Sequence, residues 1–149
     1  MTFVSFVVIL YLPLSTQNEK YPKFDMGYEL SVRTSFAAAH QLKGYEGACE
    51  NIHGHNWKVE VCIKADKLDS IGIALDFKIM KKKTDEVISA LDHTNLNQVP
   101  PFDVINPSSE NIARWLYQKL ADALKTWDVK VSRVAVWETD TYCATYMEG

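Results

Sequence analysis

The chain has 149 residues, of which 47% are apolar and 23% are charged, with only 6 Gly and 5 Pro. This composition is typical of one compact domain with a full core, and it excludes disorder, collagen-like repeats and a second sizeable domain. The 19 acidic and 16 basic side chains give a formal net charge of -3. Because no excess of cations is present to neutralise a phosphate backbone, we expect no nucleic-acid partner.

The first 25 residues carry an apolar run from Phe3 to Leu14, broken by Ser5 and Pro13. This run is shorter than the roughly 20 apolar residues of a membrane-spanning helix. The first basic side chain is Lys20 and no Ala-x-Ala cleavage site follows, so a secretory signal is not indicated. We expect residues 1–25 to be an N-terminal extension, residues 26–149 to form the domain, and no membrane to be involved.

Three cysteines, Cys49, Cys62 and Cys143, are present. An odd number cannot all pair within one chain, and a domain of this size does not need disulfides to hold its core. The cysteine content therefore favours a reducing, cytoplasmic location.

The first half of the domain is expected to form a long antiparallel hairpin. Residues from Tyr28 to His40 are rich in β-favouring side chains, and a loop from Gln41 to Ile52 carries two glycines. From Trp57 to Lys64 apolar and polar residues alternate, which predicts a strand with one buried face.

Two helices are expected next. Asp76 is placed to cap the first, and Ser108 or Ser109 the second. The lysines at 81–83 are expected in solvent. The predicted buried stripes are Phe77, Met80, Thr84, Val87, Ile88 and Leu91 in the first helix, and Ile112, Trp115, Leu116, Leu120, Ala123, Leu124 and Trp127 in the second.

The chain closes with two β-rich runs, from Val129 to Glu138 and from Tyr142 to Met147, which predict a second hairpin. The order strand, strand, helix, helix, strand, strand (ββααββ) predicts an α+β fold, with two helices on one face of a four-stranded antiparallel sheet. The other face and the open edges need cover, so we expect a homo-oligomer.

Three of the four histidines, His40, His53 and His55, lie within sixteen residues. His53 and His55 share one face of a strand, and the hairpin brings His40 beside them. Three imidazoles without a fourth fixed ligand are typical of a catalytic zinc that keeps one position open. Two alternatives stay open: ordinary histidines without a metal, or a closed structural site in which the Cys49 thiolate is the fourth ligand.

Five further side chains are candidates for chemistry. Cys49 lies close to the predicted metal, which favours its thiolate, and Glu50 beside it is a second acid/base candidate. Asp92 can orient His93, although a histidine at a helix end is often only a dipole partner. Glu138 follows a strand, where its carboxylate can accept two parallel N–H bonds from a flat amidine-like ring; the alternative is a solvated acid.

Six segments occur in order between Met26 and the C-terminus: Phe36–His40, Cys49–Trp57, Leu75–Phe77, Leu91–Asn97, Pro107–Asn111 and Trp137–Thr139. Together they resemble the 6-pyruvoyl-tetrahydropterin synthase and 6-carboxytetrahydropterin synthase family. The resemblance implies a tunnelling fold, in which the sheets of neighbouring subunits close into a barrel and two trimers stack as a hexamer. It also implies a homo-oligomer whose active sites lie between subunits.

The resemblance assigns roles residue by residue. His40, His53 and His55 would bind one Zn²⁺ per subunit, Cys49 would be the general base, Asp92 and His93 the proton relay, and Glu138 the anchor of the pterin ring. Ser108 and Ser109 belong to a matching segment and would contact the substrate. The implied substrate is 7,8-dihydroneopterin triphosphate.

The implied activity is a zinc-dependent lyase that makes 6-carboxy-5,6,7,8-tetrahydropterin for queuosine and other deazapurines. Two related reactions are alternatives: the 6-pyruvoyl product, or cleavage to a 6-hydroxymethyl pterin for folate. Members of the folate-linked branch carry Glu in place of Cys, and this chain has both, as Cys49 and Glu50. An alternative outside this chemistry is a metal- or pterin-binding protein without turnover, which would not need Cys49, Asp92 and His93 together.

Overall fold

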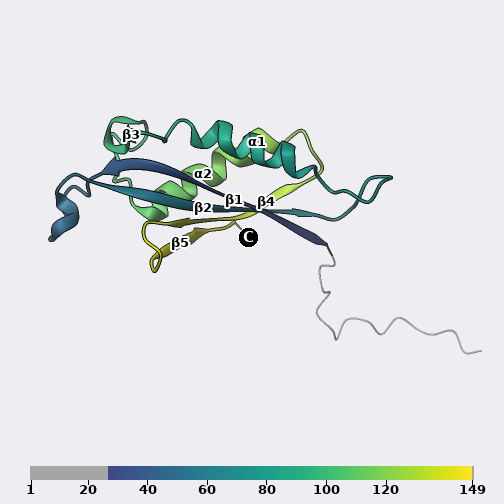
Figure 1. Cartoon of the computed structure of the whole chain (residues 1–149), viewed down its shortest axis with the longest axis horizontal. Helices are drawn as coiled ribbons and strands as arrows, with labels where there is room; N and C mark the ends of the chain where they lie inside the picture. The colour runs from purple at the N-terminus through teal and green to yellow at the C-terminus, as the bar shows by residue number, and fades with distance from the viewer. Residues whose placement is uncertain (1–26, 149) are drawn as a thin grey trace, which may run out of the picture.

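The computed structural model describes residues 27–148, so the expected extension at 1–25 lies outside the described residues. Figure 1 shows a single twisted sheet with both α-helices, α1 and α2, on one of its faces. The strands lie in the order β3-β1-β2-β4-β5. This arrangement confirms the α+β class and the placement of the helices.

Strands β1 (Tyr28–His40) and β2 (His53–Ala65) form the predicted hairpin. Their antiparallel register is unbroken from the pair Tyr28 and Ala65 to the pair His40 and His53. The connecting loop contains a short 3-10 helix, η1 (Ala48–Glu50). Burial alternates along β1, because one face of the strand packs under the helices.

The sheet has five strands and is mixed, whereas four antiparallel strands were expected. The additional strand, β3 (Thr94–Asn95), pairs in parallel with Ala38 and Ala39 of β1. Two residues are too few to show a period in the sequence, so β3 could not be recognised there. A second 3-10 helix, η2 (Leu96–Gln98), follows β3 directly.

The second hairpin is formed by β4 (Lys130–Trp137) and β5 (Cys143–Tyr146), as the sequence predicts. β4 also pairs with β2, from Lys58 opposite Trp137 to Lys64 opposite Lys130, with a shift in register beside Cys62. The end of β4 therefore lies next to the start of β2, where two of the histidines are.

Helices α1 (Phe77–Ile88) and α2 (Ser109–Leu124) begin at the expected caps. Asp76 accepts a hydrogen bond from the amide of Lys78, and Ser108 accepts one from the amide of Asn111. The prediction that Phe77 is buried is wrong, since this side chain is 57% exposed. Helical periodicity gives the direction of a side chain, but not whether anything packs against it.

The sheet face away from the helices carries an ionic network rather than open polar side chains. Glu60 is buried between two guanidinium groups, with Arg33 Nε at 2.8 Å and Arg133 Nη1 at 3.2 Å. Cys62 is buried on the same face, and this burial raises the pKa of its thiol. The predicted exposure of alternate residues in β2 is therefore wrong at Glu60 and Cys62, where side chains of neighbouring strands cover the sheet.

Among residues 27–148, no helix is long and apolar enough to cross a membrane.

Candidate metal centre and active site

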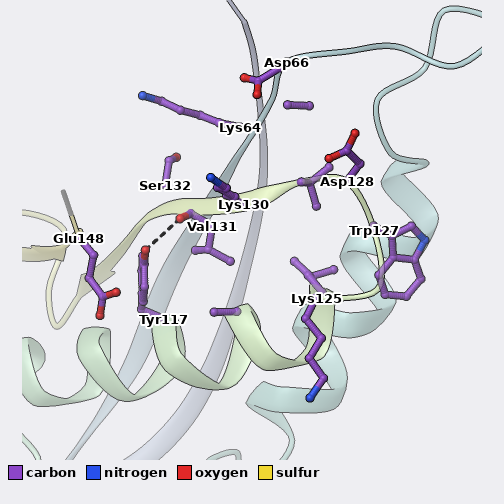
Figure 2. A pocket seen from close by; sticks show the side chains of 14 residues that line it. Lys64, Asp66, Tyr117, Lys125, Trp127, Asp128, Lys130, Val131, Ser132 and Glu148 are labelled. Carbon is purple, nitrogen blue, oxygen red and sulfur yellow. Dashed lines mark hydrogen bonds between the residues drawn. The ribbon is translucent and has the colours of Figure 1, made fainter. Parts of the chain in front are cut away.

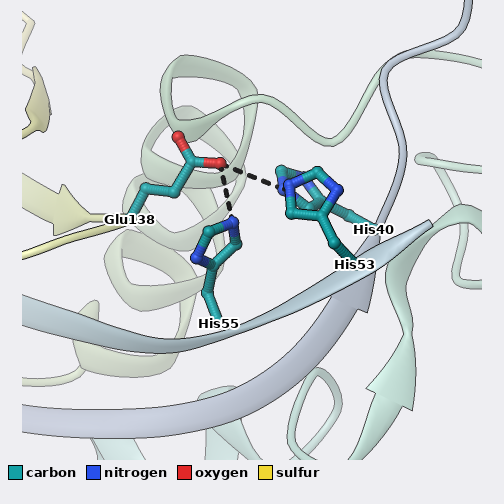
Figure 3. Close-up of side chains that lie close together, drawn as sticks. All are labelled: His40, His53, His55 and Glu138. Carbon is teal, nitrogen blue, oxygen red and sulfur yellow. Dashed lines mark hydrogen bonds and ion pairs between the residues drawn. The ribbon is translucent and has the colours of Figure 1, made fainter. Parts of the chain in front are cut away.

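The three clustered histidines meet at the loop end of the first hairpin (Figure 3). Their ring centroids lie 4.6 Å apart for His40 and His53, 4.8 Å for His53 and His55, and 5.3 Å for His40 and His55. The fully buried Trp57 packs edge-on against His40 and His55. The strand spacing that predicted a shared face therefore holds in three dimensions.

Backbone carbonyls determine the tautomers of two of these rings. Nδ1 of His40 lies 2.8 Å from the carbonyl oxygen of Pro107, and Nδ1 of His53 lies 2.7 Å from that of Asn51. Because a carbonyl oxygen only accepts, each Nδ1 must carry the hydrogen. In the neutral rings both Nε2 atoms then present lone pairs toward the centre, as metal-binding imidazoles do.

His55 supplies a buried nitrogen without a hydrogen bond. Its Nε2 has no hydrogen-bond partner, although Glu138 Oε1 lies 3.2 Å away at ion-pair distance. Burial is the main cause that lowers the pKa of His55, and the carboxylate of Glu138 opposes it. The lowered pKa favours the neutral ring, and a buried imidazole nitrogen without a hydrogen bond fits a metal ligand.

Glu138 reaches the same centre from the end of β4. Its Oε1 lies 3.1 Å from His40 Nε2 and 3.2 Å from His55 Nε2. One ligand atom from each of these four residues lies within 4.8 Å of the others. Three imidazole nitrogens and a carboxylate oxygen suit zinc and similar divalent transition metals, so the residues present fit a bound metal.

The sequence did not group Glu138 with the histidines, and it offered Cys49 as the possible fourth ligand. In the structure Cys49 is not a member of the group. The missed signal lies in the pairing of β2 with β4, because Trp137 lies opposite Lys58 and the next residue, Glu138, then lies beside the histidine end of β2.

The loop that carries Cys49 and Glu50 is held in place by two asparagines. The side chain of Asn97 both accepts from the amide and donates to the carbonyl of Gln41, and Asn106 does the same with Lys43. Cys49 is half-buried and Glu50 is exposed on η1. These contacts fix the base of the loop relative to the three clustered histidines.

Asp92 and His93 form a dyad beside β1. Asp92 accepts a hydrogen bond from the amide of Ala37 at 2.9 Å, and its other oxygen lies 2.9 Å from His93 Nδ1. The Ala37 amide first, and His93 after it, lower the pKa of Asp92. His93 has a positive φ of 57°, and its side chain is 82% exposed. Its Nε2 is therefore directed away from the dyad, toward solvent.

Ser108 and Ser109 border a cavity of about 230 Å³ at the start of α2. His40 and Glu138 also line this cavity, together with the exposed ring of Tyr142 from the second hairpin. The cavity is thus open to the candidate metal centre. A second, shallower cavity of about 390 Å³ contains both His55 and His93.

A larger cavity of about 720 Å³ lies at the opposite end of the sheet (Figure 2). The lining of this cavity has no net charge, because it contains three lysines and three acidic residues: Lys64, Lys125, Lys130, Asp66, Asp128 and Glu148. The hydroxyl of Tyr117 is already used, since it donates to the carbonyl of Val131 at 3.0 Å. The histidine end of the sheet is therefore the better candidate for chemistry.

Comparison with known proteins agrees with this geometry. Residues 29–149 match the family described as 6-pyruvoyl tetrahydropterin synthase. The chain belongs to this family. A dihydroneopterin monophosphate aldolase of Pyrococcus furiosus is 37% identical over 110 residues, which cover 74% of this chain and 89% of the relative. A 6-carboxy-5,6,7,8-tetrahydropterin synthase of Synechocystis is 36% identical over 117 residues, which cover 75% and 87%.

The fold has a matching solved structure. That of Caenorhabditis elegans 6-pyruvoyl tetrahydropterin synthase superimposes with a TM-score of 0.72 at 25% identity, over 83% of this chain and 97% of the other. The resemblance to the tetrahydropterin synthases is thereby confirmed, and the chain is a lyase of this type.

Proposed function

We propose that the protein is a zinc-dependent pterin synthase that converts 7,8-dihydroneopterin triphosphate to 6-carboxy-5,6,7,8-tetrahydropterin, with loss of triphosphate and a two-carbon fragment. The observation that carries the proposal is the convergence of His40, His53 and His55 beside a cavity that Glu138 also lines. The relative from Synechocystis, named for this product, supports the choice.

Each candidate residue then has a task. His40, His53 and His55 hold the metal, which when bound lowers the pKa of a coordinated hydroxyl. Cys49 removes a proton from the substrate side chain, and the Asp92–His93 dyad returns one, since His93 has a free ring nitrogen. Glu138 accepts N–H bonds from the pterin ring, and Ser108 and Ser109 line the cavity that receives it.

We further propose a homo-oligomer, a hexamer of two trimers with sheets closed into barrels. Two features support it: a second sheet face without helices, and a His93 side chain that is directed into solvent within its own chain. An exposed dyad can serve the site of a neighbouring subunit.

Cleavage of the side chain is the second candidate activity, with the 6-pyruvoyl synthase reaction as a further alternative. The cleavage reaction is favoured by two observations: the Pyrococcus furiosus relative is named as an aldolase, and Glu50 lies next to Cys49. In this reaction a base takes the proton of the 2′ hydroxyl and a carbonyl forms at C2′. The C1′–C2′ bond breaks, its electron pair passes to C1′, and a proton returns there. The products are 6-hydroxymethyl-dihydropterin and a two-carbon aldehyde that keeps the phosphate.

The deciding experiment is incubation of the zinc-loaded protein with the triphosphate and, separately, with the monophosphate of 7,8-dihydroneopterin. Mass spectrometry distinguishes the 6-carboxy, 6-pyruvoyl and 6-hydroxymethyl products. We expect the 6-carboxy product from the triphosphate. Predominance of the 6-hydroxymethyl product would establish the second candidate instead, and pterin binding without any turnover would overturn both.

A further inference from the structure

The contact between Glu138 and His40 needs a cation to be favourable. His40 Nδ1 carries its hydrogen on the side of Pro107, so Nε2 presents a lone pair to Glu138 Oε1 at 3.1 Å. The same nitrogen lies 3.2 Å from His53 Nε2, whose ring is fixed in the same way by Asn51. One proton can satisfy one of these contacts, whereas a single metal ion between the groups satisfies all of them.

Three of the separations between the ligand atoms agree with one shared ion, and all four ligand atoms lie within 4.8 Å of one another. Bonds of about 2.0 to 2.1 Å at tetrahedral angles require neighbouring ligand atoms to lie about 3.3 Å apart. The separations are 3.1 Å and 3.2 Å from Glu138 Oε1 to His40 and His55, and 3.2 Å between His40 and His53. Glu138 is therefore placed as a fourth ligand, where the proposed function requires a carboxylate for the pterin ring.

We propose that Glu138 exchanges between two partners: it is the fourth metal ligand in the substrate-free enzyme, and it leaves the metal to hold the pterin ring when substrate binds. This inference rests on the proposed function. The departure frees one metal position for a hydroxyl of the substrate side chain. Four protein ligands thus fill the coordination sphere of the metal until the pterin ring is bound.

The exchange requires a side-chain rotation and no movement of the backbone. The amide of Glu138 is held by the carbonyl of Tyr142 across the turn at 3.2 Å. The Glu138 side chain is still 25% exposed, and it borders the cavity between α2 and the second hairpin. Turning into that cavity takes the carboxylate from the imidazoles toward Ser108 and Ser109.

The closed state makes a prediction about ligand choice. A polyol such as glycerol offers hydroxyl groups for the metal but no amidine-like ring for Glu138, so it should not displace the carboxylate. A pterin with its side chain, such as 7,8-dihydroneopterin, offers both. Binding of the pterin ring is therefore required to free a coordination position on the metal.

The first test measures zinc affinity by competition with a chelator, without substrate. We expect E138Q to bind zinc at least about tenfold more weakly than the wild-type protein, since an anionic ligand becomes a neutral amide. E110Q is the matched control, because Glu110 lines the same cavity but is not a member of the metal-binding group. We expect E110Q to keep the wild-type affinity.

The second test follows the visible spectrum of the cobalt(II)-substituted protein, which depends on ligand number and geometry. We expect 7,8-dihydroneopterin, but not glycerol, to change the wild-type spectrum, and E138Q to differ from wild type before any ligand is added. Equal zinc affinities together with equal spectra for wild type and E138Q would overturn the exchange and leave the proposed function standing. Failure of the wild-type protein to bind zinc at all would instead overturn the proposed function.

Discussion

The role of an individual histidine in this site depends on which of its nitrogens carries the hydrogen. His53 donates from Nδ1 to the carbonyl of Asn51, so its Nε2 is free for a metal. His93 uses Nδ1 to contact Asp92, so its Nε2 is free for a proton. The two rings have the same chemistry, and in the proposed function their backbone and carboxylate partners assign them different tasks.

This division predicts opposite effects on metal content. We expect H53A to lose both zinc and turnover, because one of the four ligand groups is removed. We expect H93A to keep about one zinc per chain but to lose turnover, because only the dyad is broken. Metal analysis of the purified proteins and product formation are the measurements. Full zinc and full activity in H53A would contradict the metal assignment.

The adjacent Cys49 and Glu50 predict a separation of products. A thiolate is a stronger nucleophile and base than a carboxylate, so Cys49 should dominate the synthase reaction and Glu50 the cleavage. We expect C49A to lose the 6-carboxy product but to keep some 6-hydroxymethyl product, and E50Q to show the reverse. Mass spectrometry gives the product ratio. Equal loss of every product in both variants would make Glu50 an ordinary loop residue.

At the scale of elements, long periodic segments could be predicted from the sequence and pairings between distant segments could not. The hairpin of β1 and β2 and both helix caps follow from local patterns. The two residues of β3 show no period. The place of Glu138 beside the histidines depends on the pairing of β4 with β2, which no local pattern encodes. The histidines of the candidate metal centre were therefore predictable from the sequence, and the place of Glu138 beside them was not.

The ionic network on the helix-free face predicts a pH dependence of stability. The hydrogen bond from Arg33, and that from Arg133 after it, lower the pKa of Glu60 below its ordinary value of 4.5, although desolvation opposes them. A carboxyl whose pKa is lower in the folded state stabilises the fold above the unfolded-state pKa, and this contribution is lost as the pH falls through the folded-state value.

We therefore expect E60Q to be less stable than the wild-type protein at pH 7, and the difference to shrink as the pH falls below about 4. Urea unfolding at several pH values measures this difference in the free energy of unfolding. S132A is a suitable control, because the Ser132 hydroxyl donates to Glu29 at the exposed margin of the network and not to Glu60. A difference between E60Q and wild type that is the same at every pH would show that the charge of Glu60 does not matter.

For the whole molecule, the proposed assembly would bring an exposed dyad of one chain to the metal centre of another. We expect C49A and H93A each to lack formation of the 6-carboxy product, and their mixtures to regain some of it after subunit exchange, because some sites then combine an intact Cys49 with an intact His93. Activity measured against mixing time, with exchange followed by mass, tests it. No recovery despite proven exchange would place the relay within one chain.

The unbroken pairing of β1 with β2 limits how this protein can change in length over evolution. Side chains alternate between the two faces of a strand, so adding or deleting one residue within the hairpin turns every side chain beyond that point to the opposite face. One such change between Trp57 and His55 would move His53 and His55 away from His40 while the hydrophobic core stayed intact. Within the hairpin, a change in length that keeps this register therefore falls in the loop from Gln41 to Ile52, comes in pairs, or is absorbed by a bulge such as the register shift beside Cys62. The register of the hairpin thus couples its length to the relative positions of the three histidines.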